Sequence, residues 1–174
     1  MRLQRWWAEH ETRVLRFAIL LMSVAALVWL IYQFWRLLVP GPPLWPTSPK
    51  GAVDLIYRHA EVHRWFAGLP VYGEMKTATY PPASYAMLWP LLGWLELAQA
   101  RWLWACINLA ALGWLAHLLV RESGADRPAE RLFIALLPLA AYSTGATIGN
   151  GQLIVALMPL LIASPLRVQR ARDW

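Results

Sequence analysis

The sequence predicts an all-α protein, a polytopic bundle of transmembrane helices. Hydrophobic residues make up 59% of the chain and charged residues only 15%, whereas a soluble domain carries about 25% charged residues. Many of the twelve tryptophans lie near the ends of long apolar runs, as in the aromatic belts of membrane proteins. The net charge of +6 comes from basic residues between these runs, which favours a role in membrane topology and gives no support to nucleic-acid binding.

The N-terminal part predicts a basic cytoplasmic segment, residues 1–16, followed by a membrane helix. Residues 17–35 carry no charge and are long enough to span a hydrocarbon layer of about 30 Å as a helix. A cleaved signal peptide is the alternative. Its apolar region would be shorter and would end in small residues, whereas this run ends in Phe34, Trp35 and Arg36. We therefore expect an uncleaved first span with its N-terminus in the cytoplasm.

Residues 36–82 form the longest polar interval and are expected to lie outside the cytoplasm. Five prolines in residues 40–49 prevent a helix there and predict an extended segment. Apolar residues at helical spacing then predict a helix at residues 55–67 that lies on the membrane surface, and Gly68 offers its end. Asp54 stands where an N-cap residue would, so one interpretation is that it only caps this helix.

The rest of the chain predicts further apolar segments separated by polar turns. Residues 83–95 are too short to span and contain Pro90, which favours a re-entrant or short helix. After them we expect a span (102–120), a cytoplasmic turn (121–131), a span (132–147), an external turn (149–152), a short span (153–163) and a cytoplasmic tail (164–174).

Charge placement supports this topology. Ten of the sixteen lysines and arginines fall in the three short segments expected in the cytoplasm, in agreement with the positive-inside rule. If residues 83–95 span instead, the basic cluster at 121–131 moves outside and the rule is violated. The preferred topology places residues 54–82 and 149–152 on the same, extracytoplasmic side.

Several short motifs occur in an order that resembles a known family. They are Asp54-Leu55-Ile56-Tyr57-Arg58, Ala67-Gly68-Leu69-Pro70-Val71-Tyr72, Tyr80-Pro81-Pro82, Trp89-Pro90-Leu91 and Gly151-Gln152. Their order over residues 53–163 is similar to that of the polyprenol-phosphate-mannose-dependent mannosyltransferases, which form glycosyltransferase family 87 of the GT-C superfamily. Members of that family are considerably longer, so this chain is expected to be the N-terminal portion of such an enzyme.

The resemblance implies a GT-C-like helix bundle that crosses the plasma (inner) membrane several times and has its active site at the extracytoplasmic face. The donor would be a sugar, mannose in this family, on a polyprenyl phosphate, and the acceptor a lipid or cell-envelope glycan. Asp54 stands at the position of the family's catalytic base, which would take the proton of the acceptor hydroxyl. The leaving phosphate is already charged, so neither a metal nor another cofactor is expected.

Five further residues are candidates for binding the donor phosphate or the substrates: Arg58, Arg64, Tyr80, Asn150 and Gln152. Guanidinium groups of the surface helix suit a phosphate, but they also anchor such helices to lipid headgroups. Tyr80 either lines an acceptor groove or only shapes the turn that starts the next helix. The Gly-Asn-Gly-Gln break either opens a helix whose free N–H groups attract anions or forms a helix–helix turn.

Two other functions are compatible with a small membrane protein. A transporter or channel component is disfavoured, because the expected spans carry no charged residue at mid-depth and no repeated pair of broken helices. A non-catalytic fragment or accessory membrane subunit, which assembles with a partner subunit or with a missing C-terminal portion, stays open as the alternative to a functional transferase.

Overall fold

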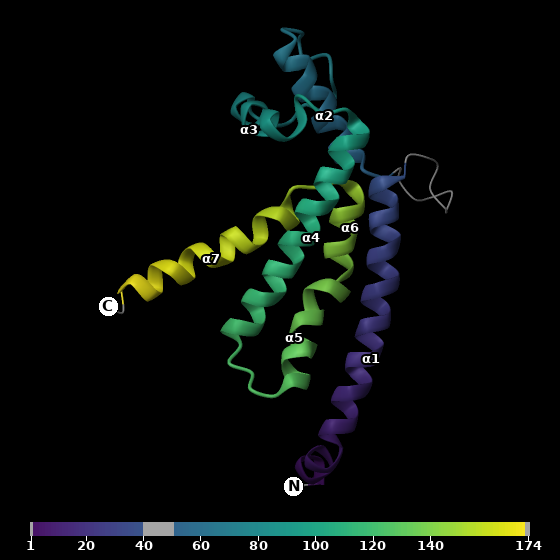
Figure 1. The fold of residues 1–174 in the computed structure, drawn as a ribbon, viewed down its shortest axis with the longest axis vertical. Helices are drawn as coiled ribbons and strands as arrows, with labels where there is room; N and C mark the ends of the chain where they lie inside the picture. Colours follow the sequence, from purple (N-terminus) through teal and green to yellow (C-terminus); the bar gives the residue numbers. More distant parts are fainter. Residues whose placement is uncertain (1, 40–50, 173–174) are drawn as a thin grey trace. The chain divides into compact units, whose positions relative to one another are not determined.

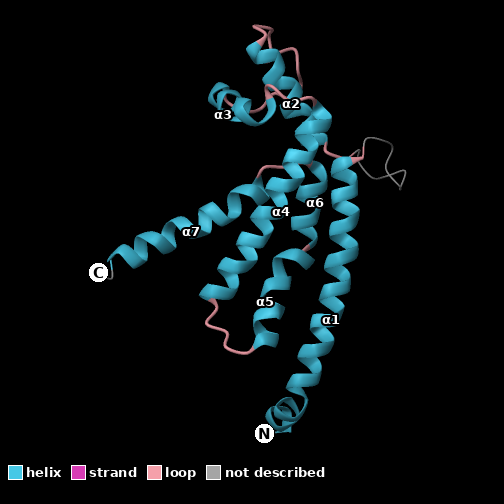
Figure 2. Cartoon of the chain, in the orientation of Figure 1, coloured by secondary structure: helices cyan, strands magenta, loops and turns pink. Residues whose placement is uncertain are grey.

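The computed structural model describes residues 2–39 and 51–172, and within these ranges every regular element is a helix (Figure 2). This confirms the predicted all-α membrane fold. The extended segment predicted at residues 40–49 lies outside the described residues. Two helical stretches, Thr12–Leu38 and Leu97–Glu122, are long and apolar enough to cross a membrane, and a bent pair of helices adds a third if it forms one span.

The first helix, α1, runs without interruption over Arg2–Leu38 (Figure 1), beyond both ends of the predicted span at residues 17–35. Neither proline nor glycine occurs between these bounds, so no residue strongly opposes helix along its length. Phe17, Leu20 and Val24 are among its exposed apolar side chains, as expected for a helix surrounded by lipid.

The segments form two compact units, which are described separately. One comprises Met1–Tyr32, Ala110–Gly145 and Ile154–Trp174, and the other Gln33–Leu109 and Ala146–Leu153. The helices α1, α4 and α6 each contribute residues to both units.

The predicted span at residues 132–147 is interrupted. It divides into α5 (Pro128–Ala140) and α6 (Tyr142–Asn150), which meet at an angle of 45°. The break falls at Ala141, whose backbone is extended with ψ 127. Pro138 removes one amide donor from the last turn of α5, which weakens the helix just before the break.

The flanking helices extend past their predicted bounds. Helix α4 covers Leu97–Glu122, where a span at 102–120 was expected, and α7 covers Ile154–Arg172, where a short span at 153–163 was expected. Only Ile154–Val168 of α7 counts as an apolar helix, and it is shorter than the candidate spans.

The second unit contains two short helices, α2 (Val53–Phe66) and α3 (Pro82–Leu92). Pro82 occupies the first turn of α3, where its missing N–H costs nothing. Leu55 and Val62 of α2 and Tyr85, Leu88 and Leu92 of α3 form much of the buried core of this unit. The packing of this core sets the orientation of α2, the helix that carries Asp54, Arg58 and Arg64.

Candidate active site

Asp54 lies in the first turn of α2 and does not cap it. The helix begins at Val53, and the N-cap position belongs to Ala52, which has a left-handed backbone (φ 57, ψ 28) and no side-chain capping bond. The predicted capping role of Asp54 is therefore wrong. Its side chain is half-buried, and no hydrogen bond or ion pair joins its carboxylate to any other residue that the structure describes. The N-terminal turn of a helix stabilises a negative charge.

The beginning of α2 docks on the end of α6. The Ala52 N–H donates to the Gly149 carbonyl at 2.7 Å. Gly151 packs so closely on Leu55 that an added Cβ would lie 2.6 Å from the Leu55 Cβ. The two segments that the topology placed on one side of the membrane, 54–82 and 149–152, are thus in direct contact at Leu55.

The Gly-Asn-Gly-Gln segment ends α6 and leads into α7. Helix α6 ends at Asn150 and Gly151 is left-handed, with φ 76. The Gly151 N–H donates to the Ile148 carbonyl and the Gln152 N–H to the Thr147 carbonyl, each at 2.9 Å. This is the Schellman arrangement that ends helices. The N–H groups of Gly151 and Gln152 are therefore already bonded within the end of α6, and an anion site at the start of the following helix, α7 (Ile154–Arg172), stays a prediction.

Arg58 is engaged within the second unit. Its Nη1 lies 2.8 Å from the Glu61 carboxylate, its Nη2 donates to the Thr77 carbonyl at 2.7 Å, and its guanidinium lies 4.3 Å from the centre of the Tyr80 ring. Glu61 is fully buried and also accepts from the Thr77 hydroxyl. Burial raises the pKa of Glu61, while Arg58 and the Thr77 hydroxyl oppose that rise. Arg58 and Tyr80 therefore fix the segment that leads into α3.

Arg64 holds the segment that follows α2. Its Nε and Nη2 both donate to the Pro70 carbonyl, at 3.1 and 2.9 Å, and Nη2 lies 3.5 Å from the Glu74 carboxylate. An exposed pair of this kind contributes little to stability. The contacts give Arg64 a structural role, and its phosphate-binding role stays a prediction.

Two histidines join α2 to the end of α3. The Nε2 atoms of His59 and His63 donate to the carbonyls of Leu95 and Leu92, at 2.8 and 3.1 Å, and the two rings are 4.3 Å apart. A carbonyl only accepts, so the proton must be on Nε2 in both rings. Burial lowers the pKa of His59, and the nearby His63 lowers it further, against the opposing hydrogen bond to Leu95.

A buried polar cluster at the end of α1 was missed by the sequence analysis. Arg36 donates from Nη1 to the Gln33 side-chain oxygen and from Nη2 to the Asn150 side-chain oxygen, each at 2.9 Å. Arg101, near the start of α4, donates to the Leu37 carbonyl at 3.1 Å. Gln33, Arg36 and Arg101 are all buried. The sequence treated both arginines as topological charges, and only Gln33, a polar residue within an apolar run, offered a signal.

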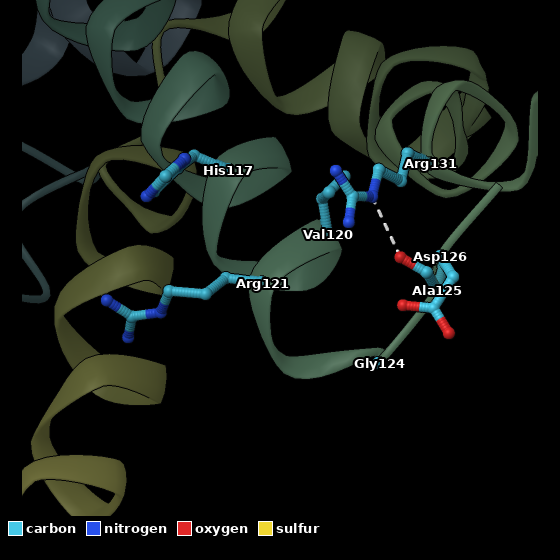
Figure 3. Close-up of a pocket in the computed structure, with 7 residues that line it drawn as sticks. All are labelled: His117, Val120, Arg121, Gly124, Ala125, Asp126 and Arg131. Atoms are coloured by element: carbon cyan, nitrogen blue, oxygen red, sulfur yellow. Dashed lines mark hydrogen bonds between the residues drawn. The ribbon is translucent and has the colours of Figure 1, made fainter. Parts of the chain in front are cut away.

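Two cavities lie in the first unit, and neither contains a predicted site residue. One of about 340 Å³ lies at the turn from α4 to α5 (Figure 3), where Arg131 donates to the Ala125 carbonyl at 2.8 Å. Another of about 650 Å³ lies along α7 beside Trp114. Nor do three or more His, Cys, Asp or Glu side chains gather as metal ligands anywhere in the described part of the chain.

Comparison with known proteins identifies the family. The sequence model of Glycosyltransferase family 87 matches residues 78–174. No curated protein and no solved structure matches the chain. The matched segment includes Tyr80, Asn150 and Gln152 and begins after Asp54. Leu55, the residue after Asp54, packs on Gly151 of this segment. Because the match covers more than half of the chain, the protein belongs to glycosyltransferase family 87, a family of membrane glycosyltransferases.

Proposed function

We propose that the protein transfers mannose from a polyprenyl-phosphate donor to a lipid or cell-envelope glycan at the extracytoplasmic face of the plasma membrane, with Asp54 as the base. The observation that carries this proposal is the state of the Asp54 carboxylate, which bonds to no other described residue. Glu61, on the same helix, is paired with Arg58. Of these two carboxylates of α2, Asp54 is the one left to bond a substrate.

The docking of α2 supports the same assignment. Leu55 follows Asp54 directly and packs on Gly151 of the segment that matches the family. Before Asp54 in the chain, the hydrogen bond from the Ala52 N–H to the Gly149 carbonyl holds the start of α2 in place. Tyr80 and Gln152, which also lie in the matched segment, are proposed as contacts to the substrates.

The proposed reaction is a single displacement at the anomeric carbon. Asp54 takes the proton of the acceptor hydroxyl while the oxygen of that hydroxyl attacks the anomeric carbon. The bond from this carbon to the phosphate oxygen breaks, and polyprenyl phosphate leaves with the electron pair. The transfer inverts the configuration at the anomeric carbon. It requires the Asp54 carboxylate within about 2.6–3.2 Å of the acceptor hydroxyl.

The test is transfer of radiolabelled mannose from polyprenyl-phosphate mannose by membranes that carry the protein. Asp54→Asn keeps the size of the side chain but removes the base, so kcat should fall by about 100-fold to 10,000-fold. Stability should change by less than about 1 kcal/mol, because the carboxylate bonds to no described group. The matched control is Asp126→Asn, an exposed aspartate at the turn from α4 to α5.

Full transfer by Asp54→Asn would remove Asp54 from the catalytic role. Transfer from polyprenyl-phosphate glucose in preference to the mannose donor would overturn the sugar assignment and leave the role of Asp54 standing.

A further inference from the structure

The end of α1 and the start of α4 gather hydrogen-bond donors that other described residues do not satisfy. Arg101 is only 5% exposed, donates to the Leu37 carbonyl, and has no carboxylate paired with it among the described residues. Gln33 is fully buried, and its Nε2 amide nitrogen has no hydrogen-bond partner there. Both groups are donors.

The orientation of the Gln33 amide is fixed by its neighbour. Its oxygen accepts from Arg36 Nη1, and reversing the amide would place two donors against each other. Gln33 and Leu37 lie one turn apart on the same face of α1. The free amide nitrogen of Gln33 and the carbonyl that accepts from Arg101 therefore both lie within the last two turns of α1.

A buried guanidinium without a negative partner is unfavourable, and an ionisable residue within a membrane-spanning helix commonly marks a binding site. Arg101 lies near the start of α4, which is long and apolar enough to cross a membrane. A ligand that satisfies both Arg101 and the Gln33 amide must accept hydrogen bonds and carry negative charge. A phosphate meets both conditions and binds guanidinium groups in a geometry that matches them.

The same helix end is linked to the proposed base through short contacts. The Arg36 carbonyl lies so close to Gly51 that an added Cβ would overlap it, and the Arg36 side chain bonds to Asn150. Asn150 precedes Gly151, which packs on Leu55. By contrast, the charges of Arg58 and Arg64 already face carboxylates.

We propose that Arg101 and the Gln33 amide, next to Arg36, bind the phosphate of the polyprenyl-phosphate donor. This inference rests on the proposed function for the identity of the donor. It assigns the phosphate to the end of α1 and the start of α4, and gives Arg58 and Arg64 the structural roles that their contacts show.

The test compares binding of polyprenyl phosphate with binding of the uncharged polyprenol of the same chain length. Arg101→Gln should weaken binding of the phosphate by about 30-fold or more and leave binding of the alcohol unchanged. Arg101→Lys keeps the positive charge but lacks the planar guanidinium, so its loss of affinity for the phosphate should be intermediate. The matched control is Arg121→Gln, an exposed arginine at the other end of α4. Native mass spectrometry of the purified protein in detergent measures both affinities.

A structural role for Arg101, as a bond to the end of α1 alone, predicts equal weakening of the phosphate and the alcohol, and that result would overturn the proposal. Competition separates the sources of phosphate. If phosphatidylglycerol vesicles displace polyprenyl phosphate from the wild-type protein as well as unlabelled polyprenyl phosphate does, the site binds headgroups in general and the donor assignment is wrong. Inorganic phosphate should compete weakly, since it lacks the polyprenyl chain.

Failure of this proposal is distinguishable from failure of the proposed function. Loss of phosphate discrimination in Arg101→Gln, with no sugar transfer by wild-type membranes, supports the binding site and contradicts the transferase reaction. Wild-type transfer with an unchanged KM for the donor in Arg101→Gln supports the reaction and contradicts the binding site.

Discussion

Replacing Gly151 by alanine tests the contact that places Asp54 beside the family-matched segment. Gly151 has φ 76, and its added Cβ would lie 2.6 Å from the Leu55 Cβ and 3.1 Å from the Leu55 nitrogen. The left-handed backbone costs an alanine about 1–2 kcal/mol, and crowding a packed contact costs about 1–3 kcal/mol more. The reduced freedom of the unfolded chain offsets about 0.4–1 kcal/mol. We expect a net destabilisation of about 1–4.5 kcal/mol.

Gly124→Ala is the matched control for the backbone term. Gly124 also has a left-handed backbone, with φ 65, but nothing lies within 4 Å of an added Cβ. Gly124→Ala should therefore cost only the strain of the left-handed backbone, partly offset by the reduced freedom of the unfolded chain. The net destabilisation should be about 1 kcal/mol. The difference between the two variants isolates the contact with Leu55. Tryptophan fluorescence during denaturant unfolding in detergent micelles measures both.

The same pair of variants should differ in activity. Crowding at Leu55 displaces the turn that carries Asp54, and a displacement of about 1 Å near a reacting group costs up to about 100-fold in rate. Mannose transfer should fall in Gly151→Ala and stay near the wild-type rate in Gly124→Ala. If the two variants lose equal stability and equal activity, Leu55 does not pack on Gly151 and the docking of α2 does not position the base.

Two further predictions concern the pH dependence of α2 and the topology. Burial lowers the pKa of His59 below its usual 6.5, so the contribution of His59 to stability is present above pH 6.5 and is lost as the pH falls through the lowered pKa. His59→Gln should therefore reduce the change in melting temperature between pH 7.5 and pH 5, and an unchanged difference between these two melting temperatures contradicts this. For the topology, the natural cysteine is first removed by Cys106→Ser, and a single cysteine is then introduced by Lys76→Cys. This new cysteine should react with a membrane-impermeant thiol reagent added to intact cells. If it reacts only after the membrane is opened, the extracytoplasmic placement is wrong.

The main elements of the fold followed from local features of the sequence. An apolar run without charge, at residues 17–35, predicted the first helix, and Pro82 marked the start of α3. Helix ends were predicted less well. The N-terminal basic segment continues α1, and a break at Ala141 interrupts the span expected at residues 132–147, since neither charge nor apolarity fixes where a helix stops.

The site was predicted in part. The sequence identified Asp54 and placed residues 149–152 on the same side of the membrane, and the structure brings these segments into contact at Leu55. The alternative that Asp54 only caps the helix is wrong, because the left-handed Ala52 occupies the N-cap position and the helix begins at Val53. The sequence analysis also treated Arg101 as a topological charge, since a buried arginine and an exposed one look the same in a sequence.

The sequence by itself therefore determined the class of the protein, the positions of most helices and the aspartate proposed as the base. Composition, the length of apolar runs and turn residues are local properties of the chain, so they can be interpreted without knowledge of the fold. Only the tertiary structure decided which charged groups are compensated. Arg58 is paired with Glu61, while Arg101 and Gln33 are buried near the end of α1. Such pairing depends on segments far apart in the chain, and packing alone brings them together.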